Sequence, residues 1–263
     1  MVKQQGTHTF VICAYKEIPY LEECVKSLLS QTVKSEILIS TSTPNDFIKK
    51  IAKKYHIKLV INTGKKGHIE DFCFAYRQAN TKYVTLCHQD DVYYPDFTEK
   101  IIQKMDKHRR PIIGFANYNE IRDSKTIKRS MLLRTKRIMN LPLIFLGQFR
   151  AIRLCNLAFG NAICAPTVTY NKEMLDYPIK KSDFSSNIDW DTYDEFARMD
   201  GAFIYIPKAL LGHRIHSEST TSHVIQNHTK AKEDLIMFER YWPHCIARQI
   251  AKLYKTSEKN NTL

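Results

Sequence analysis

The chain has 263 residues, an apolar fraction of 43% and a formal net charge of +13. No segment approaches the roughly 18 apolar residues of a membrane span, and residues 1–5 lack the apolar core of a signal peptide, so the sequence predicts a cytoplasmic protein. The seven cysteines have no close pair, which argues against a zinc ribbon or a disulfide framework and predicts small buried apolar side chains.

Strands alternate with helices through the first part of the chain. Apolar runs predict strands at 9–14, 36–40, 58–61 and 83–87, and helical spacing predicts helices at 20–30, 46–55 and 68–79. This alternation indicates a parallel sheet that is covered on both faces. The segments that follow the strands would meet at one edge, where open α/β sheets bind ligands.

A basic segment interrupts the pattern after a predicted helix at 96–107 and a predicted strand at 111–115. Residues 121–160 carry nine Lys and Arg against the single acid Asp123, a net charge of +8, with apolar residues between them. This mixture suits an anionic membrane surface. Nucleic acid is the competing partner, and a solvated surface without a partner is the third interpretation.

The remaining elements are shorter and more scattered. Strands are expected at 167–170 and 202–206. Apolar residues at helical spacing between 230 and 254, interrupted at Pro243, predict two amphipathic helices that either pack on the domain or contact a membrane or partner. Residues 257–263 are expected to be frayed.

Two acidic clusters are candidates for chemistry. Asp90 and Asp91 directly follow the strand at 83–87, close enough together for one divalent cation, and Mg²⁺ is usually held by one or two carboxylates plus substrate phosphates. That combination suggests a nucleoside diphosphate substrate, although a turn or a helix cap explains the pair as well. Asp189 lies in a second cluster that resembles a helix start, where capping alone would also account for the acids.

The order of these motifs resembles family 2 glycosyltransferases of the GT-A fold, from about Thr9 to Ser222. The turn at 13–17, the helix at 20–32 and the acidic helix start at 188–191 are similar to the family's opening turn, first helix and catalytic motif. His88-Gln89-Asp90-Asp91 resembles its Asp-x-Asp-Asp metal motif, and residues 203–219 resemble its late strand and Arg-x-His segment. The resemblance implies an α/β fold with a Rossmann-like, mostly parallel sheet flanked by helices and a C-terminal helical extension.

The resemblance also implies three segments and a set of residue roles. Residues 1–120 would bind the nucleotide sugar, residues 121–229 would complete the same domain with the acceptor-binding and catalytic half, and residues 230–263 would form the helical extension. Asp90 would bind Mn²⁺ or Mg²⁺ with help from Asp91, and Asp189 would be the general base of an inverting transfer. The expected donor contacts are Tyr15 for the base and Lys65 or Lys66, Arg214 and His216 around the diphosphate. His88 is expected to be a further cofactor-binding residue, at the first position of the metal motif.

Three positions depart from the family pattern. Thr41 and Ser42 stand where an Asp commonly reads the base, so their hydroxyls would have to take that role, with a UDP-sugar favoured. His88 replaces the first acid of the metal motif, and Cys73 replaces an Asn in the third helix.

The predicted function is therefore metal-dependent transfer of a sugar to a glycan acceptor in cell-surface polysaccharide synthesis, with a lipid-linked acceptor favoured. Peripheral attachment to the inner face of the cell membrane is expected, and nucleic acid is not expected as a partner. The alternatives are a nucleic-acid-binding protein that uses residues 121–160, and a GT-A pseudoenzyme or assembly subunit.

Overall fold

The computed structural model describes residues 6–216 and 228–259. Two parts of the sequence predictions lie outside this range. One is the end of the family resemblance, residues 217–222, which includes the end of the predicted late segment. The other is the end of the expected frayed tail, residues 260–263. No helix among the described residues is long and apolar enough to cross a membrane.

The first part of the chain follows the predicted alternation closely. Three of the four apolar runs become mostly buried strands, whereas the run at 58–61 forms a strand that is partly exposed. The helices turn apolar side chains toward the sheet; Leu21, Val25 and Leu28, for example, are buried on one side of the first helix. The elements are β1 (His8–Ala14), α1 (Leu21–Leu29), β2 (Glu36–Thr41), α2 (Asp46–Lys54), β3 (Lys58–Ile61), α3 (His68–Gln78) and β4 (Tyr83–His88).

The second part contains longer strands than the sequence predicts. The strands expected at 111–115 and 202–206 extend to Arg122 and Arg214, because buried polar side chains inside them find partners: the Tyr205 hydroxyl lies 2.5 Å from Asn117 Oδ1, and Asn119 donates to the Tyr94 hydroxyl at 3.0 Å. The elements are β5 (Val92–Tyr93), α4 (Phe97–Met105), β6 (Pro111–Arg122), β7 (Lys125–Ile127), α5 (Met131–Asn140), α6 (Leu143–Leu146), α7 (Arg150–Leu157), η1 (Ala165–Thr167), β8 (Thr169–Asn171), α8 (Ile188–Arg198), β9 (Ala202–Arg214), α10 (His228–Glu239) and α11 (His244–Lys259).

One sheet joins all of the described strands. Its order is β3-β2-β1-β4-β8-β6-β9-β5, with β7 paired to β6. β1 to β4, β6 and β9 run in one direction, whereas β5, β7 and β8 run against their neighbours. The sheet is therefore mostly parallel, as expected. Because β6 runs through residue 120, the predicted division between the two halves falls inside a strand.

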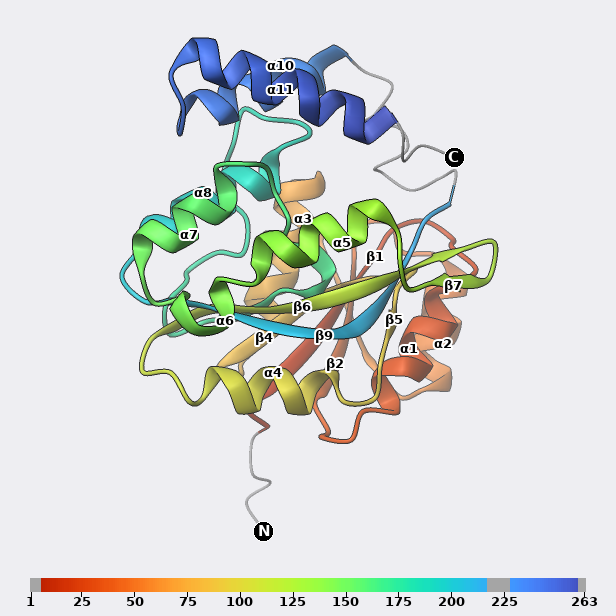
Figure 1. Ribbon diagram of the computed structural model, residues 1–263. Coiled ribbons are helices and arrows are strands. Elements are labelled where there is room, and N and C mark those ends of the chain that lie inside the picture. The colour runs from red at the N-terminus through yellow and green to blue at the C-terminus, as the bar shows by residue number, and fades with distance from the viewer. Residues whose placement is uncertain (1–5, 217–227, 260–263) are drawn as a thin grey trace.

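Two apolar cores cover the two faces of this sheet. Alternation along β1 sends Phe10 and Ile12 into the core with α1, α2 and α4, and Val11 into the core with α3, α7, α8 and α10. Figure 1 shows α4 below β6 and β9, and α5 to α8 above them. The prediction of buried cysteines is correct for Cys24, Cys87 and Cys164 but wrong for Cys155 and Cys245, which lie on exposed helix positions.

The two predicted C-terminal helices are confirmed and form an upper layer over α7 and α8 (Figure 1). The Phe238 ring packs edge-on against Trp190 with 5.0 Å between centroids, and Met237 and Ala247 are buried in the same core. These apolar side chains of α10 and α11 thus pack on the domain. Ile246 and Leu253 on α11 are exposed.

Candidate active site

The acidic pair lies in the short turn between β4 and β5. β5 pairs with β9 in antiparallel register, with Val92 opposite Gly212, and this pairing draws residues 213–216 alongside the acids. Residues separated by more than 120 positions in the chain, such as Asp91 and His213, thereby come into direct contact.

Asp91 is the buried anchor of this turn. Its side chain is 0% exposed, and its Oδ1 accepts the Arg214 backbone N–H at 2.9 Å and lies 2.9 Å from His213 Nδ1. Burial opposes its charge, but His213, His88 and the Arg214 N–H outweigh that effect and hold the pKa of Asp91 below its usual value. Burial likewise opposes the charge on His213, and Asp91 overcomes it, so the pKa of His213 is raised. The two groups form an ion pair inside the turn.

Asp90 lies beside this pair with its own partners. Its Oδ2 is 2.9 Å from His216 Nε2, a contact that the sequence did not predict, and the expected contact of His216 with a diphosphate stays a prediction. The Arg214 side chain holds the backbone of Asp90, because its Nε donates to the Asp90 carbonyl at 2.9 Å. Arg214 is itself held by Glu23 and Tyr20: its Nη2 donates to Glu23 Oε2 at 2.6 Å, and its guanidinium lies 4.1 Å from the Tyr20 ring centroid. The buried Arg214 therefore has its donors directed at protein groups, and its predicted contact with a diphosphate stays a prediction.

The residues of this turn fit a divalent cation. Ligand atoms of His88, Asp90 and Asp91 lie within 4.8 Å of one another. In addition, Asp91 Oδ2 is buried and has no hydrogen-bond partner among the described residues, so a cation would satisfy an oxygen that is otherwise left alone. Two carboxylates and one imidazole are donors that a divalent cation accepts.

Asp189 lies in the first turn of α8 and is half-buried. Burial raises the pKa of Asp189, and the nearby His68 and His88 oppose that rise. His88 also acts on the charge of Asp91. His68 and His88 both pack against the Phe72 ring, with centroids 4.7 Å and 5.8 Å away. The two acidic positions, about 100 residues apart in the sequence, therefore approach one region.

The C-terminal helices hold the segment that leads into α8. Glu233 of α10 accepts the backbone N–H groups of Ser185, Ser186 and Asn187 at 2.7 to 3.0 Å, which holds the pKa of Glu233 below its usual value despite burial. Arg240 donates to Asp191 Oδ1 at 2.6 Å. The position of Asp189 therefore depends on α10.

Tyr15 lies where β1 ends, next to the acidic turn. Its ring is 53% exposed, while Gln89 bonds both its N–H, at 3.1 Å, and its carbonyl, at 2.8 Å. The neighbouring Lys16 has a left-handed backbone, φ 55°, and donates its N–H to Thr43 Oγ1 at 2.7 Å. The exposed Tyr15 ring is therefore carried on a backbone that Gln89 holds in place, and a flat ligand such as a base could stack on this ring.

Thr41 and Ser42 are both buried, and their hydroxyls have protein partners. Thr41 Oγ1 accepts the Thr43 N–H at 3.0 Å, and Ser42 Oγ donates to Asp71 Oδ2 at 2.8 Å. Asn62 donates to Asp71 Oδ1 at 2.7 Å. The sequence analysis missed Asp71: a carboxylate is present beside β2 after all, and it comes from α3.

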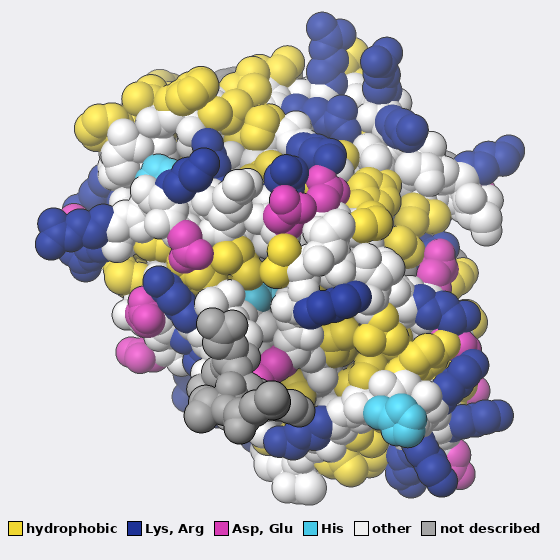
Figure 2. Space-filling model, turned by 90° about the horizontal axis from the view of Figure 1, so that it is seen from below, with side chains coloured by type: hydrophobic (Ala, Val, Ile, Leu, Met, Phe, Trp, Pro, Cys, Tyr) yellow, Lys and Arg dark blue, Asp and Glu magenta, His cyan; other side chains and the backbone are white. Residues whose placement is uncertain are grey.

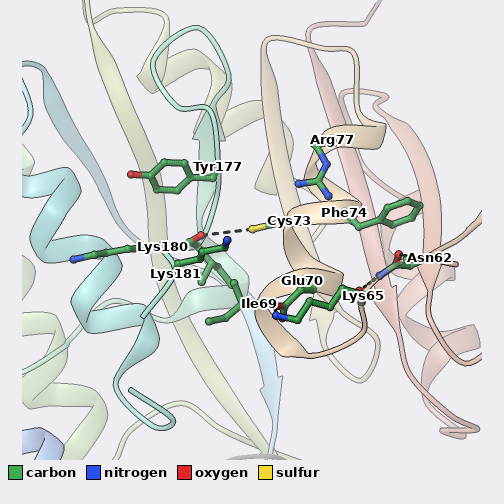
Figure 3. Close-up of a pocket in the computed structure, with 12 residues that line it drawn as sticks. Asn62, Lys65, Ile69, Glu70, Cys73, Phe74, Arg77, Tyr177, Lys180 and Lys181 are labelled. Carbon is green, nitrogen blue, oxygen red and sulfur yellow. Dashed lines mark hydrogen bonds and ion pairs between the residues drawn. The ribbon is translucent and has the colours of Figure 1, made fainter. Parts of the chain in front are cut away.

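Lys65 lies apart from the acidic turn. Its Nζ is 2.7 Å from Glu70 Oε1, in a groove of about 710 Å³ along the outer side of α3. Figure 3 shows Ile69, Cys73 and Arg77 of α3 on one wall and Tyr177, Lys180 and Lys181 on the other, with Cys73 Sγ contacting the Ile179 carbonyl at 3.5 Å. None of the acids of the site lines this groove. The structure shows no contact between Lys65 or the exposed Lys66 and those acids.

A mostly parallel α/β sheet with an acidic turn after its fourth strand and a second acid on a later helix defines the GT-A class of transferases. Residues 9–168 match the family described as glycosyl transferase family 2, and the chain belongs to this family. The family and the fold predicted from the sequence are thereby confirmed.

Two curated relatives are called uncharacterized glycosyltransferases. The one from Haemophilus influenzae is 25% identical over 225 residues, which cover 83% of this chain and 68% of that protein. The one from Rickettsia prowazekii, RP339, is 24% identical over 233 residues, which cover 86% and 69%.

Solved structures show the same fold at low identity. S. aureus TarS aligns with a TM-score of 0.61 at 15% identity over 93% of this chain, which spans only 42% of that chain. TarS 1–349 in complex with UDP-GlcNAc gives 0.63 at 15% identity over 94% of this chain and 70% of that one. The mannosyltransferase PcManGT from Pyrobaculum calidifontis, in complex with GDP-Man and Mn²⁺, gives 0.65 at 14% identity over 95% and 69%.

Proposed function

We propose that this protein is a metal-dependent inverting glycosyltransferase that moves a sugar from a nucleoside diphosphate sugar to a glycan acceptor. The observation that carries the proposal is the position of His88. A nitrogen of its ring lies within 4.8 Å of the Asp90 and Asp91 carboxylates, and its ring shares Phe72 with His68, the residue that most lowers the pKa of Asp189. An inverting transfer needs a base on the acceptor side and stabilisation of a leaving diphosphate on the other.

Asp189 is the proposed general base. It takes the proton of the acceptor hydroxyl as that oxygen attacks the anomeric carbon, while the nucleoside diphosphate leaves from the opposite face. The raised pKa caused by burial makes Asp189 a better proton acceptor than an exposed Asp, and the nearby His68 and His88 keep its ionised form accessible.

His88, Asp90 and Asp91 are the proposed holders of a divalent cation, Mn²⁺ or Mg²⁺. When bound there, the cation would neutralise charge on the departing diphosphate. The protein's own contribution is positional: His216 orients the Asp90 carboxylate, Arg214 holds the Asp90 carbonyl, and the Asp91–His213 pair fixes the turn.

The donor is proposed to place its base on Tyr15, next to the Ser42–Asp71–Asn62 network. A carboxylate in this network can accept an N–H from uracil or from guanine, and a UDP-sugar stays the donor that we propose first. Of the similar structures, one holds UDP-GlcNAc and another GDP-Man. Both nucleotides therefore belong in any donor screen.

The acceptor is proposed to be a lipid-linked glycan of a cell-surface polysaccharide, reached at the inner face of the cell membrane. Exposed hydrophobic side chains on α5, α6 and the loop after α6 support this part of the proposal, together with the +8 charge of residues 121–160. Figure 2 shows hydrophobic side chains gathered along the upper left margin of one face of the molecule, with Lys and Arg side chains nearby.

A screen of donor hydrolysis tests the proposal. Purified protein is incubated with UDP- and GDP-sugars with Mn²⁺, with Mg²⁺ and with a chelator, and release of the nucleoside diphosphate is measured. We expect release that depends on the cation and falls about 100-fold or more in Asp90→Ala. If no nucleotide sugar reacts and Asp90→Ala binds nucleotides as wild type does, the enzyme proposal fails and the pseudoenzyme alternative replaces it.

A further inference from the structure

Three arginines surround a cavity at the start of α5. Arg129, Arg134 and Arg137 line a space of about 560 Å³ together with Ser130 and Met131. Among the described residues no carboxylate forms an ion pair with any of the three, and the first turn of α5 contains no acid. The cavity therefore concentrates positive charge that the neighbouring protein does not neutralise.

Arg137 has unused hydrogen-bonding capacity at this place. Its Nη2 donates to the Tyr118 carbonyl at 3.2 Å and to Asn119 Oδ1 at 3.3 Å, but its Nε is buried and has no partner in the described part of the chain. The Ser130 side chain caps α5 by accepting the Leu133 N–H at 3.1 Å. A guanidinium held in position by one edge can present its remaining N–H groups to a phosphate oxygen.

Large apolar side chains project beside the same cavity and along the following helix. Met131 is 79% exposed and Phe145 is 80% exposed, and Ile138 and Phe149 are also exposed. Met131 is itself part of the cavity lining. Exposed apolar side chains flanked by cations fit the boundary between lipid headgroups and acyl chains, where both kinds of contact are available.

The arginine cavity is connected to the reaction centre through one strand. Arg137 holds Tyr118 and Asn119 of β6, the Tyr118 ring lies 5.9 Å from the His213 ring, and His213 pairs with Asp91. Figure 1 shows α5 over β6, between β7 and α6. A ligand in the cavity would thus lie on the side of the molecule that the acidic turn also uses.

We propose that Arg129, Arg134 and Arg137 form a binding site for the phosphate headgroup of an anionic lipid, with Met131 and Phe145 entering the apolar layer beside it. This inference rests on the proposed function and deepens it, because it assigns the membrane contact to one site. Arg binds phosphate through paired N–H groups, and each cation near an anionic surface strengthens attachment about fivefold.

Flotation with lipid vesicles tests the site. Wild-type protein is expected to float with phosphatidylglycerol-containing vesicles, to stay behind with pure phosphatidylcholine and to lose binding as salt is raised. Arg129→Gln combined with Arg134→Gln should weaken binding roughly 30-fold, because two cations are lost. Lys107→Gln with Arg109→Gln removes the same charge from the exposed loop after α4, on the opposite side of β6 and β9, and should have little effect.

The apolar contribution has its own variants. Met131→Ser with Phe145→Ser should lower vesicle binding without lowering the unfolding temperature, because both side chains are exposed. Val33→Ser, at an exposed apolar position outside residues 121–160, is the matched control. Equal losses in the paired variants and their controls would overturn the assignment.

Two soluble ligands, inorganic phosphate and an oligonucleotide, test whether the arginines bind a phosphate that is not part of a lipid. Wild type that fails to float but binds inorganic phosphate at these arginines would overturn the lipid assignment, and so would binding of an oligonucleotide that only the arginine variant loses. Flotation requires no donor, so its failure leaves donor hydrolysis intact. Conversely, absence of donor hydrolysis with normal flotation would refute the proposed function alone.

Discussion

The two acidic parts of the site are held in different ways. Asp90 and Asp91 lie in a tight turn between two strands, and their side chains contact His213, Arg214 and His216 at the end of β9 and just beyond it. Asp189 lies on a helix whose entry segment is held by Glu233 of α10. The first position is built into the sheet, whereas the second depends on a layer added at the C-terminus.

Under the proposed mechanism, this difference would separate donor binding at the turn from proton transfer at α8. Changes around the turn should act on the donor and the cation, and changes around α8 should act on the rate of transfer. The following variants challenge that separation, in order of decreasing expected effect.

Asp189→Asn should have the largest effect. It removes the proposed proton acceptor and keeps the side chain's size, so donor turnover should fall about 10²- to 10⁴-fold, while nucleotide affinity measured by calorimetry stays near that of wild type. Asp183→Asn, an exposed acid in the preceding loop, is the control. A parallel loss of nucleotide affinity in Asp189→Asn would show that the two parts are not separate.

The pH dependence of turnover should report the same residue. Burial raises the pKa of Asp189 from the usual value of 3.8. Because a base must be ionised, the rate should fall as the pH drops through this raised pKa, at a higher pH than for an exposed Asp. If the residual activity of Asp189→Asn falls at low pH over the same range as in wild type, this fall comes from another group and not from Asp189.

Asp71→Asn should affect the donor more than the rate. The carboxylate bonded to Ser42 and Asn62 is replaced by an amide that cannot accept on both sides. We expect KM for the donor to rise about tenfold, the equivalent of about 1.4 kcal/mol, with kcat within a few fold of wild type. Asp46→Asn on the exposed start of α2 provides the comparison, and a collapse of kcat in Asp71→Asn would contradict a role in donor binding.

Glu233→Gln should produce the smallest effect on activity and a measurable one on stability. Loss of charge at an acceptor of three backbone N–H groups should reduce the free energy of unfolding by about 1.5 to 3 kcal/mol and slow turnover a few fold. Since the folded-state pKa of Glu233 lies below its usual 4.5, this stabilisation is present above that value and is lost as the pH falls through the folded-state pKa.

Denaturant unfolding of Glu233→Gln at several pH values measures this contribution. The gap between wild type and variant should shrink in acid, and Glu173→Gln, at an exposed carboxylate, should show no such gap. A gap that is independent of pH would mean that the carboxylate charge is not what holds the segment before α8.

The sequence predicted the first region far better than the second. β1 to β4 are apolar runs with helices between them, so local pattern sufficed, and the acids at 90 and 91 followed directly from the end of such a run. Asp71 was missed because its role depends on Ser42, a partner on another element. Glu233 was missed because an acid within a basic tail gives no local sign that it caps a segment almost 50 residues earlier.

The segment between 121 and 160 shows the same limit. Its charge and apolar content predicted a surface with a partner, but not that three of its arginines would share one cavity. Spacing along a chain indicates which residues share a helix face. It does not indicate that a residue just before the helix, such as Arg129, lines the same cavity.

The pairing of β5 with β9 has a consequence for how the protein is made. During synthesis the carboxylates at 90 and 91 leave the ribosome well before residues 211–214, which align with β5 and supply their partners. Domains are completed from the N-terminus onward, and contacts between distant residues form late. The nascent chain therefore carries two adjacent hydrated charges until β9 arrives, and the turn that we propose to hold a cation is among the last parts of the fold to form.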